Sequence, residues 1–107
     1  MKRRRIANQC DITCPVRKAM NVLDGKWTLL IVRELLGGKK RFGELLCAIE
    51  GVSPKVLAQR LKLLEDEQVL TKVVYPEVPP RVEYELKERG QQLRTVVNAL
   101  TVWGAAL

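Results

Sequence analysis

Residues 53–67, SPKVLAQRLKLLEDE, predict a helix with a defined start and two chemically different faces. Ser53 suits the N-cap, where its hydroxyl accepts a hydrogen bond from the first turn, and Pro54 suits the first helical position. At about 100° per residue, the aliphatic side chains gather on one side: Leu57, Leu61 and Leu64. The opposite side begins basic and amide-bearing and turns acidic only at its end: Lys55, Gln59, Lys62 and then Asp66. This distribution suits a helix that enters a polyanion groove N-terminus first, although an ordinary solvated surface helix has the same features.

The residues before this stretch predict the first half of a helix-turn-helix. A short helix is expected over Phe42 to Ile49, and Glu50-Gly51-Val52 connects it tightly to Ser53. Two helices joined by about three residues that include a glycine, with the second helix capped and basic, are typical of this motif. Because helical hairpins are common, the pattern becomes specific only in combination with the residues after Gln68.

After Gln68 the sequence changes to a pattern typical of β-structure. Val69 to Tyr75 is rich in β-branched residues and predicts a strand, and Arg81 to Leu86 predicts a second strand by its alternation. The proline-rich residues 76–80 between them must form a loop. A β-hairpin directly after a helix-turn-helix makes a winged helix. We therefore expect a mainly α fold with a small β-hairpin wing (α+β), the wing covering about residues 69–86.

Three further helices complete the predicted domain, which spans residues 13–107. One starts at Cys14-Pro15 and ends at Asp24-Gly25, a second covers Lys26 to Leu36, and the last covers about residues 88–104. An apolar stripe runs along the last helix: Leu93, Val96, Val97, Leu100 and Trp103. We expect this stripe to pack against a second copy of the chain, the alternative being that it folds back on its own domain.

Composition favours a single domain with an acidic partner. The chain has 107 residues, of which 47% are hydrophobic, and a net charge of +7 without any histidine. A flexible basic tail is expected over residues 1–12, with Lys2, Arg3, Arg4 and Arg5, and Lys and Arg outnumber the acidic residues between positions 26 and 62. This excess suits nucleic acid, an anionic membrane surface or an acidic protein. No apolar run resembles a signal peptide or spans a bilayer, so we expect a cytoplasmic protein.

Short segments throughout the chain form an ordered set of motifs: Cys14-Pro15-Val16, Gly25-Lys26-Trp27-Thr28, Arg33-Glu34-Leu35-Leu36, Arg41-Phe42-Gly43-Glu44-Leu45, Ile49 to Gly51, Ser53 to Leu57, Gln59-Arg60-Leu61, Leu64-Glu65, Tyr75 to Tyr84 and Trp103-Gly104. This set resembles the HxlR-type winged helix-turn-helix transcriptional regulators of bacteria and archaea, which are related to the MarR regulators. The resemblance covers residues 14–104, and the run YPEVPPRVEY from Tyr75 to Tyr84 is its most specific part. Three positions depart from the family: Asp24 stands where glycine is usual, Ala58 where threonine is frequent, and Lys87 where threonine would cap the last helix.

The resemblance implies a homodimer that binds an inverted-repeat operator in double-stranded DNA. The N-terminal and C-terminal helices would form the interface, with Val16 and Met20 joining the C-terminal stripe. It also implies a thiol switch, because several members sense oxidants or electrophiles through the cysteine at the Cys14 position, some by bridging to another cysteine across the dimer. The effector itself is unknown.

Within this interpretation, Lys55, Gln59 and Lys62 are the base-reading candidates, because glutamine can pair with adenine and lysine with guanine. A lysine near the helix start can instead contact phosphate, which positions the protein without reading sequence. Ser53 can hold a phosphate in addition to its capping role. Arg60 lies at the edge of the apolar face, where it can reach DNA or form an internal ion pair.

The remaining DNA-binding candidates flank this helix. Arg81 begins the second strand of the wing and is expected in the minor groove or on the DNA backbone, the alternative being a salt bridge to Glu77 or Glu83. The loop Lys39-Lys40-Arg41 is expected to contact phosphates, the alternative being a solvated basic loop.

The three cysteines, Cys10, Cys14 and Cys47, do not suggest a disulfide framework, since their number is odd in a chain expected in the cytosol. Cys14 lies at a helix start beside Arg17 and Lys18, which favours its thiolate, so we consider it a candidate redox or electrophile sensor. A buried small residue is the structural alternative. Cys47 is a second candidate sensor or a core residue.

Catalysis and metal binding find no support in the sequence. The cysteines lack a fourth ligand for zinc because there is no histidine, and Glu65, Asp66 and Glu67 are successive on a helix and do not converge. We expect no enzyme activity, cofactor or metal. The leading prediction is a dimeric DNA-binding regulator, and the alternative is a winged-helix module that binds an acidic protein without reading DNA sequence.

Overall fold

The computed structural model of the protein describes residues 14–107. The predicted basic tail, with Lys2, Arg3, Arg4 and Arg5, lies outside the described residues, as does Cys10. The elements follow in the order α2 (Pro15–Val22), α3 (Lys26–Leu35), β1 (Lys40–Arg41), α4 (Phe42–Ala48), α5 (Pro54–Asp66), β2 (Leu70–Tyr75), β3 (Arg81–Leu86), α6 (Glu88–Gln91) and α7 (Arg94–Ala105). The predicted fold, mainly helical with a β-hairpin wing, is therefore confirmed.

The core lies where α3, α4 and α5 meet the base of the hairpin. The aliphatic face predicted for α5 is confirmed, because Leu57, Leu61 and Leu64 are all fully buried. They pack with Ile31 of α3, Leu45 of α4 and further buried side chains of the sheet and the C-terminal segment: Val69, Leu70, Leu86 and Val97. The inner face of α5 thus packs in the core, and its outer face is exposed to solvent.

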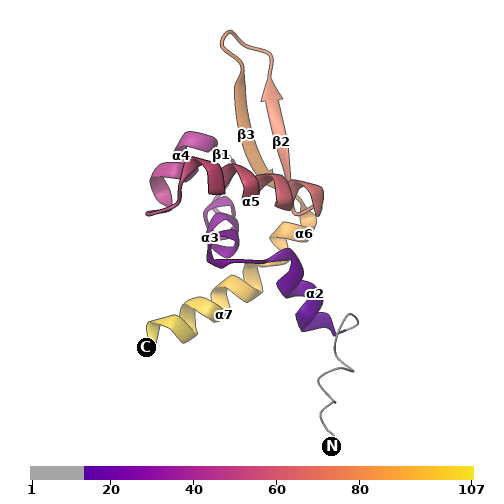
Figure 1. Cartoon of the computed structure of the whole chain (residues 1–107), viewed down its shortest axis with the longest axis vertical. Helices are drawn as coiled ribbons and strands as arrows, with labels where there is room; N and C mark the ends of the chain where they lie inside the picture. The colour runs from indigo at the N-terminus through magenta and orange to yellow at the C-terminus, as the bar shows by residue number, and fades with distance from the viewer. Residues whose placement is uncertain (1–13) are drawn as a thin grey trace, which may run out of the picture.

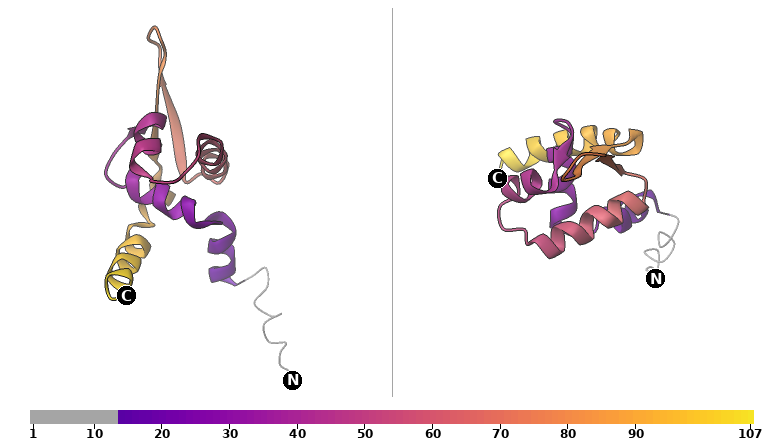
Figure 2. Two further views of the ribbon diagram at one scale, coloured as in Figure 1. Left: turned by 60° about the vertical axis from the view of Figure 1, so that its left-hand side comes forward. Right: turned by 90° about the horizontal axis from the view of Figure 1, so that it is seen from above.

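The arrangement sends the wing and the terminal helices to opposite ends of the molecule. In Figure 1, β2 and β3 project upward beyond α5, whereas α2 and α7 extend downward from α3. The left-hand view of Figure 2 shows the same separation after a rotation. A surface on α2 and α7 is therefore remote from a surface on α5 and the wing tip.

The prediction of a loop at Lys39-Lys40-Arg41 is partly wrong, because Lys40 and Arg41 form β1. They pair with Tyr84 and Glu83 of β3, so the sheet has the order β1-β3-β2. This short strand has no alternation of its own, and it exists only because β3 offers a free edge.

The prediction of one continuous C-terminal helix over residues 88–104 is also wrong. This segment forms two helices, α6 and α7, separated by a tight turn in which the Leu93 N–H donates to the Gly90 carbonyl at 3.0 Å. Gly90 packs so closely against the chain before β2 that an added Cβ would lie 2.4 Å from the Val69 carbonyl oxygen. The direction of α6 is therefore set by a tertiary contact, and α7 leaves along a different path (Figure 1).

Apolar side chains remain exposed on α2 and α7. Val16 is 69% exposed, Met20 52%, Leu100 46% and Trp103 66%, whereas Val97 is buried and Leu93 is partly buried. Within residues 14–107, no helix combines the length and apolar character that crossing a membrane requires.

Candidate nucleic-acid interface

The outer face of α5 is presented to solvent by a well-defined helix start. Ser53 is the N-cap, as predicted: its Oγ accepts a hydrogen bond from the Val56 N–H at 3.1 Å, and Pro54 occupies the first turn. Lys55, Gln59 and Lys62 are exposed on this face. Lys62 also pairs with Asp66 one turn later, Nζ to Oδ1 at 3.2 Å. The helix thus displays the three predicted base-reading side chains, and their contact with DNA stays a prediction.

Arg60 points away from this face, towards the turn between α2 and α3. Its Nη1 lies 4.0 Å from Asp24 Oδ2, and its guanidinium packs on Gly25, where an added Cβ would be 3.2 Å from Nη2. Of the two predicted alternatives, the structure therefore contains the internal ion pair. The partner is Asp24, one of the three positions that depart from the resembled family. At 4.0 Å and with an exposed carboxylate, the pair contributes little stability.

The end of the hairpin next to the 76–80 loop carries a network around Tyr75. Arg81 stacks on the Tyr75 ring, with Cζ 4.1 Å from the centroid, and Lys39 Nζ donates to the Tyr75 hydroxyl at 3.0 Å. Both predicted salt bridges of Arg81 are present: its Nη2 lies 3.4 Å from Glu77 Oε2 and its Nε 3.7 Å from Glu83 Oε2. Arg41 Nε also approaches Glu83 Oε2 at 3.9 Å. We call these residues the Tyr75 cluster: Lys39, Arg41, Tyr75, Glu77, Arg81 and Glu83.

Within the Tyr75 cluster, side-chain contacts hold Lys39 and Arg81 in place. The hydrogen bond to Tyr75 raises the pKa of Lys39 above its ordinary value. Arg41 opens α4, where its backbone N–H donates to Glu44 Oε1 at 2.7 Å. Lys40 is partly buried in β1. Of the predicted basic loop, Lys39 stays in a loop and is exposed, whereas Lys40 and Arg41 form the edge strand β1.

A groove between α5 and the sheet brings together two residues that the sequence did not single out, Lys72 and Tyr84. It has a volume of about 140 Å³ and is lined by Ala58, Leu61, Lys62, Glu65, Lys72 and Tyr84. Lys72 and Tyr84 are cross-strand partners in the hairpin. The alternation along the two strands predicts that they share a face, but not that this face meets α5.

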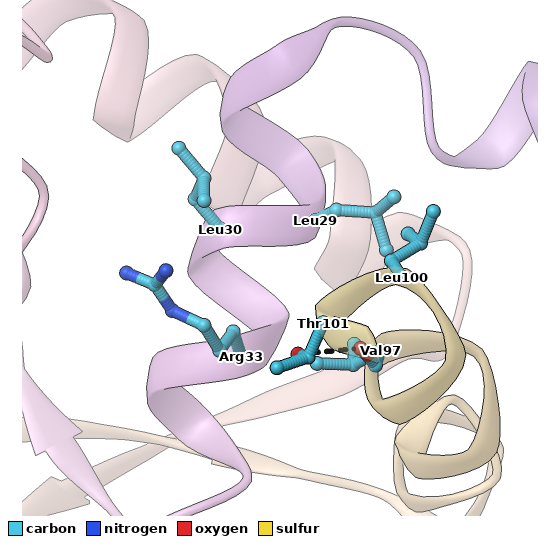
Figure 3. Close-up of a pocket in the computed structure, with 6 residues that line it drawn as sticks. All are labelled: Leu29, Leu30, Arg33, Val97, Leu100 and Thr101. Atoms are coloured by element: carbon cyan, nitrogen blue, oxygen red, sulfur yellow. Dashed lines mark hydrogen bonds between the residues drawn. The ribbon is translucent and has the colours of Figure 1, made fainter. Parts of the chain in front are cut away.

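A second cavity, of about 230 Å³, lies between α3 and α7 (Figure 3). Its walls are mostly apolar and come from Leu29, Leu30, Arg33, Val97, Leu100 and Thr101. Leu29 and Leu100 approach each other across it, and the Thr101 hydroxyl is turned inward along its own helix, donating to the Val97 carbonyl at 2.8 Å. The cavity adjoins the exposed apolar residues of α7.

The two described cysteines lie in different settings. Cys14 is the N-cap of α2 and is partly exposed, and its carbonyl accepts from the Lys18 N–H at 2.9 Å. Cys47 is a free, exposed thiol on α4, so its interpretation as a core residue is wrong. Within residues 14–107, no three His, Cys, Asp or Glu side chains come together as a metal site would require.

The fold and the cationic face of α5 define a winged helix-turn-helix protein of the transcription-regulator class. The family model for the HxlR-like helix-turn-helix matches residues 22–107, and the chain belongs to this family. It is 44% identical over 92 residues to an uncharacterized HTH-type transcriptional regulator of Synechocystis sp., covering 86% of this chain and 68% of that relative. These relatives are transcriptional regulators and not enzymes.

Solved structures of regulators have the same fold. A MarR-family transcriptional regulator from Porphyromonas gingivalis W83 superposes with a TM-score of 0.85 at 43% identity, covering 89% of this chain and 93% of that one. The redox regulator HypR in its oxidized form superposes with a TM-score of 0.83 at 34% identity, covering 88% of this chain and 97% of that one.

Proposed function

We propose that the protein is a sequence-specific DNA-binding regulator that binds an inverted-repeat operator as a homodimer. The observation that carries this proposal is the division of α5 into a fully buried leucine face and an exposed face with Lys55, Gln59 and Lys62. Such a helix can lie in the major groove, where lysine and glutamine side chains reach the edges of bases. The wing beside it carries the Tyr75 cluster, whose Arg81 would reach the adjacent minor groove.

The dimer is supported by the exposed apolar side chains on α2 and α7. Val16, Met20, Leu100 and Trp103 are exposed, and the helices α2 and α7 that carry them lie away from the wing (Figure 1). Larger exposed apolar surfaces mark protein–protein contacts. A two-fold partner there would leave both copies of α5 facing outward. The two helices would enter successive major grooves, about 34–36 Å apart.

Binding measurements on selected DNA test this function. Genomic fragments retained by the protein would supply the operator, and fluorescence anisotropy would compare its affinity with that of a random-sequence duplex at several salt concentrations. We expect operator preference and a steep loss of affinity with salt. Gln59→Ala and Lys62→Ala should each reduce the preference, because each removes a base contact worth about 1–3 kcal/mol.

Lys18→Ala on α2 is the control, since it removes a charge remote from α5 and should keep the preference. If both α5 variants retained full discrimination, the proposed orientation of α5 would be wrong. Weak binding that ignores sequence would favour the alternative module with an acidic protein partner.

We further propose that Cys14 makes DNA binding responsive to oxidants or electrophiles. Two findings support this role: its position at the start of α2, where a helix terminus favours a thiolate, and the similarity to a protein described as a redox regulator. Cys14→Ser should abolish the change in operator affinity that diamide causes, whereas Cys47→Ser should keep it. An undiminished diamide response in the Cys14 variant would contradict the proposal.

A further inference from the structure

The groove between α5 and the sheet is a separate candidate site on the DNA-facing side of the molecule. One wall comes from the α5 residues Ala58, Lys62 and Glu65, and the other from Lys72 of β2 and Tyr84 of β3. Leu61 closes its floor as part of the core. The groove therefore lies between the proposed recognition helix and the wing.

Its polar groups suit an anion. Lys72 is exposed, and within residues 14–107 it forms no ion pair, so its ammonium group is free to bind a ligand. The Tyr84 hydroxyl also has no hydrogen-bond partner among the described residues. Burial, and then the charge of Glu65, raise the pKa of Tyr84, so the hydroxyl remains a neutral donor. Ala58 adds only a methyl group to the wall.

The position of the groove determines which part of a DNA duplex can reach it. If α5 lies in the major groove and the wing in the adjacent minor groove, one sugar-phosphate strand separates the two elements, because each pair of neighbouring grooves in a duplex shares one strand. That strand must cross the surface between α5 and β2–β3. The groove is a depression on that surface.

We propose that this groove binds a backbone phosphate of the DNA strand that separates the major and minor grooves, with Lys72 supplying positive charge and the Tyr84 hydroxyl a hydrogen bond. The inference rests on the proposed DNA-binding function and adds two ligands to it, Lys72 and Tyr84. Glu65 shares the same wall and opposes the phosphate. Its charge limits the affinity of the site for DNA of any sequence.

Charge variants test the site on both the selected operator and a random-sequence duplex. Lys72→Gln should weaken binding to both duplexes by the same factor, about three- to tenfold, and reduce the salt slope by about 1, because one counterion-releasing contact is lost. Glu65→Gln should act in the opposite direction and strengthen both. Lys18→Gln makes the same change in net charge away from the groove and should change neither affinity by more than about twofold.

Single methylphosphonate substitutions along the operator give the direct readout. One neutralised phosphate, between the major-groove half-site and the adjacent minor groove, should weaken the wild-type protein more than it weakens Lys72→Gln. Tyr84→Phe should reduce the penalty at that same phosphate, which a merely structural role of the tyrosine would not do.

The results separate this inference from the proposed function. The groove proposal is overturned if Lys72→Gln binds like Lys18→Gln, or if every methylphosphonate affects wild type and Lys72→Gln equally. If the wild-type protein bound DNA without operator preference, sequence-specific regulation would be overturned. The effect of Lys72→Gln on binding to the random-sequence duplex would still test the groove. Wild-type protein that bound neither duplex would overturn both.

Discussion

Gly90 allows α6 to pack directly beneath the chain that enters β2. An added Cβ would lie 2.4 Å from the Val69 carbonyl oxygen and 2.7 Å from Leu86 Cδ2, and the Val69 carbonyl also accepts from the Lys87 N–H at 2.9 Å. Backbone atoms bound in this way cannot move aside cheaply. The absence of a side chain at this position therefore fixes how the C-terminal segment leaves the sheet.

Gly90→Ala should consequently destabilise the protein by about 2 kcal/mol, because the extra methyl overfills a packed site. Urea unfolding at one protein concentration would measure the difference, since the stability of a dimer depends on concentration. Gly43→Ala in α4 is the matched control, because an added Cβ there meets no atom within 4 Å. The control should be neutral or slightly stabilising, and equal stability of the two variants would contradict the packing argument.

Side-chain roles were predictable from the sequence where one helix alone determines them. The capping role of Ser53 and the inward leucines of α5 follow from helix geometry, and the structure confirms both. The setting of Arg60 was not predictable, because its neighbour Asp24 is brought to it only by the packing of α3 against α5. The shared groove of Lys72 and Tyr84 was not predictable for the same reason, because it forms only where α5 packs against the sheet.

At the level of elements, a contact between residues far apart in the sequence positions the wing. Lys39 precedes β1, whereas Tyr75 ends β2, and their hydrogen bond ties the wing to the body. Arg81 occupies the face of the same ring. One tyrosine therefore positions two cations, Lys39 and Arg81, that are predicted to contact DNA.

Tyr75→Phe should separate the hydrogen bond to Lys39 from the stacking on Arg81. It removes the oxygen that accepts from Lys39 and keeps the aromatic ring against Arg81. We expect weaker operator binding with an unchanged salt slope, since no charge is lost. A double-mutant cycle with Lys39→Ala gives the decisive measurement: in that background Tyr75→Phe should have no further effect. A full additional loss there would mean that the tyrosine hydroxyl contacts DNA itself, and the positioning role would be wrong.

The elements themselves were largely predictable, because glycine, proline and apolar spacing mark most of their ends. The two errors share a physical cause. β1 is held by pairing with β3, a strand far away in the chain, and the break between α6 and α7 depends on the contact of Gly90 with Val69. Neither interaction leaves a local pattern in the sequence.

At the scale of the whole molecule, the surfaces proposed for DNA and for dimerisation lie at opposite ends. The wing and α5 carry the charged groups, whereas α2 and α7 carry exposed apolar side chains (Figure 1). A partner bound at α7 would cover the cavity between α3 and α7, which Leu100 lines. Loss of the dimer should therefore affect DNA binding without any change in the DNA-contacting residues.

Leu100→Glu tests this arrangement, because it places a charge in the apolar surface of α7. We expect a folded monomer by sedimentation velocity and circular dichroism, since Leu100 is 46% exposed and contributes little to the core. Affinity for the inverted repeat should fall by about a hundredfold or more, because the second half-site would no longer be bound by a linked copy. Val78→Glu, at a fully exposed position in the wing loop, introduces the same charge and should remain dimeric. If Leu100→Glu stayed dimeric and kept its operator affinity, the interface would lie elsewhere, and the exposed stripe of α7 would need another partner.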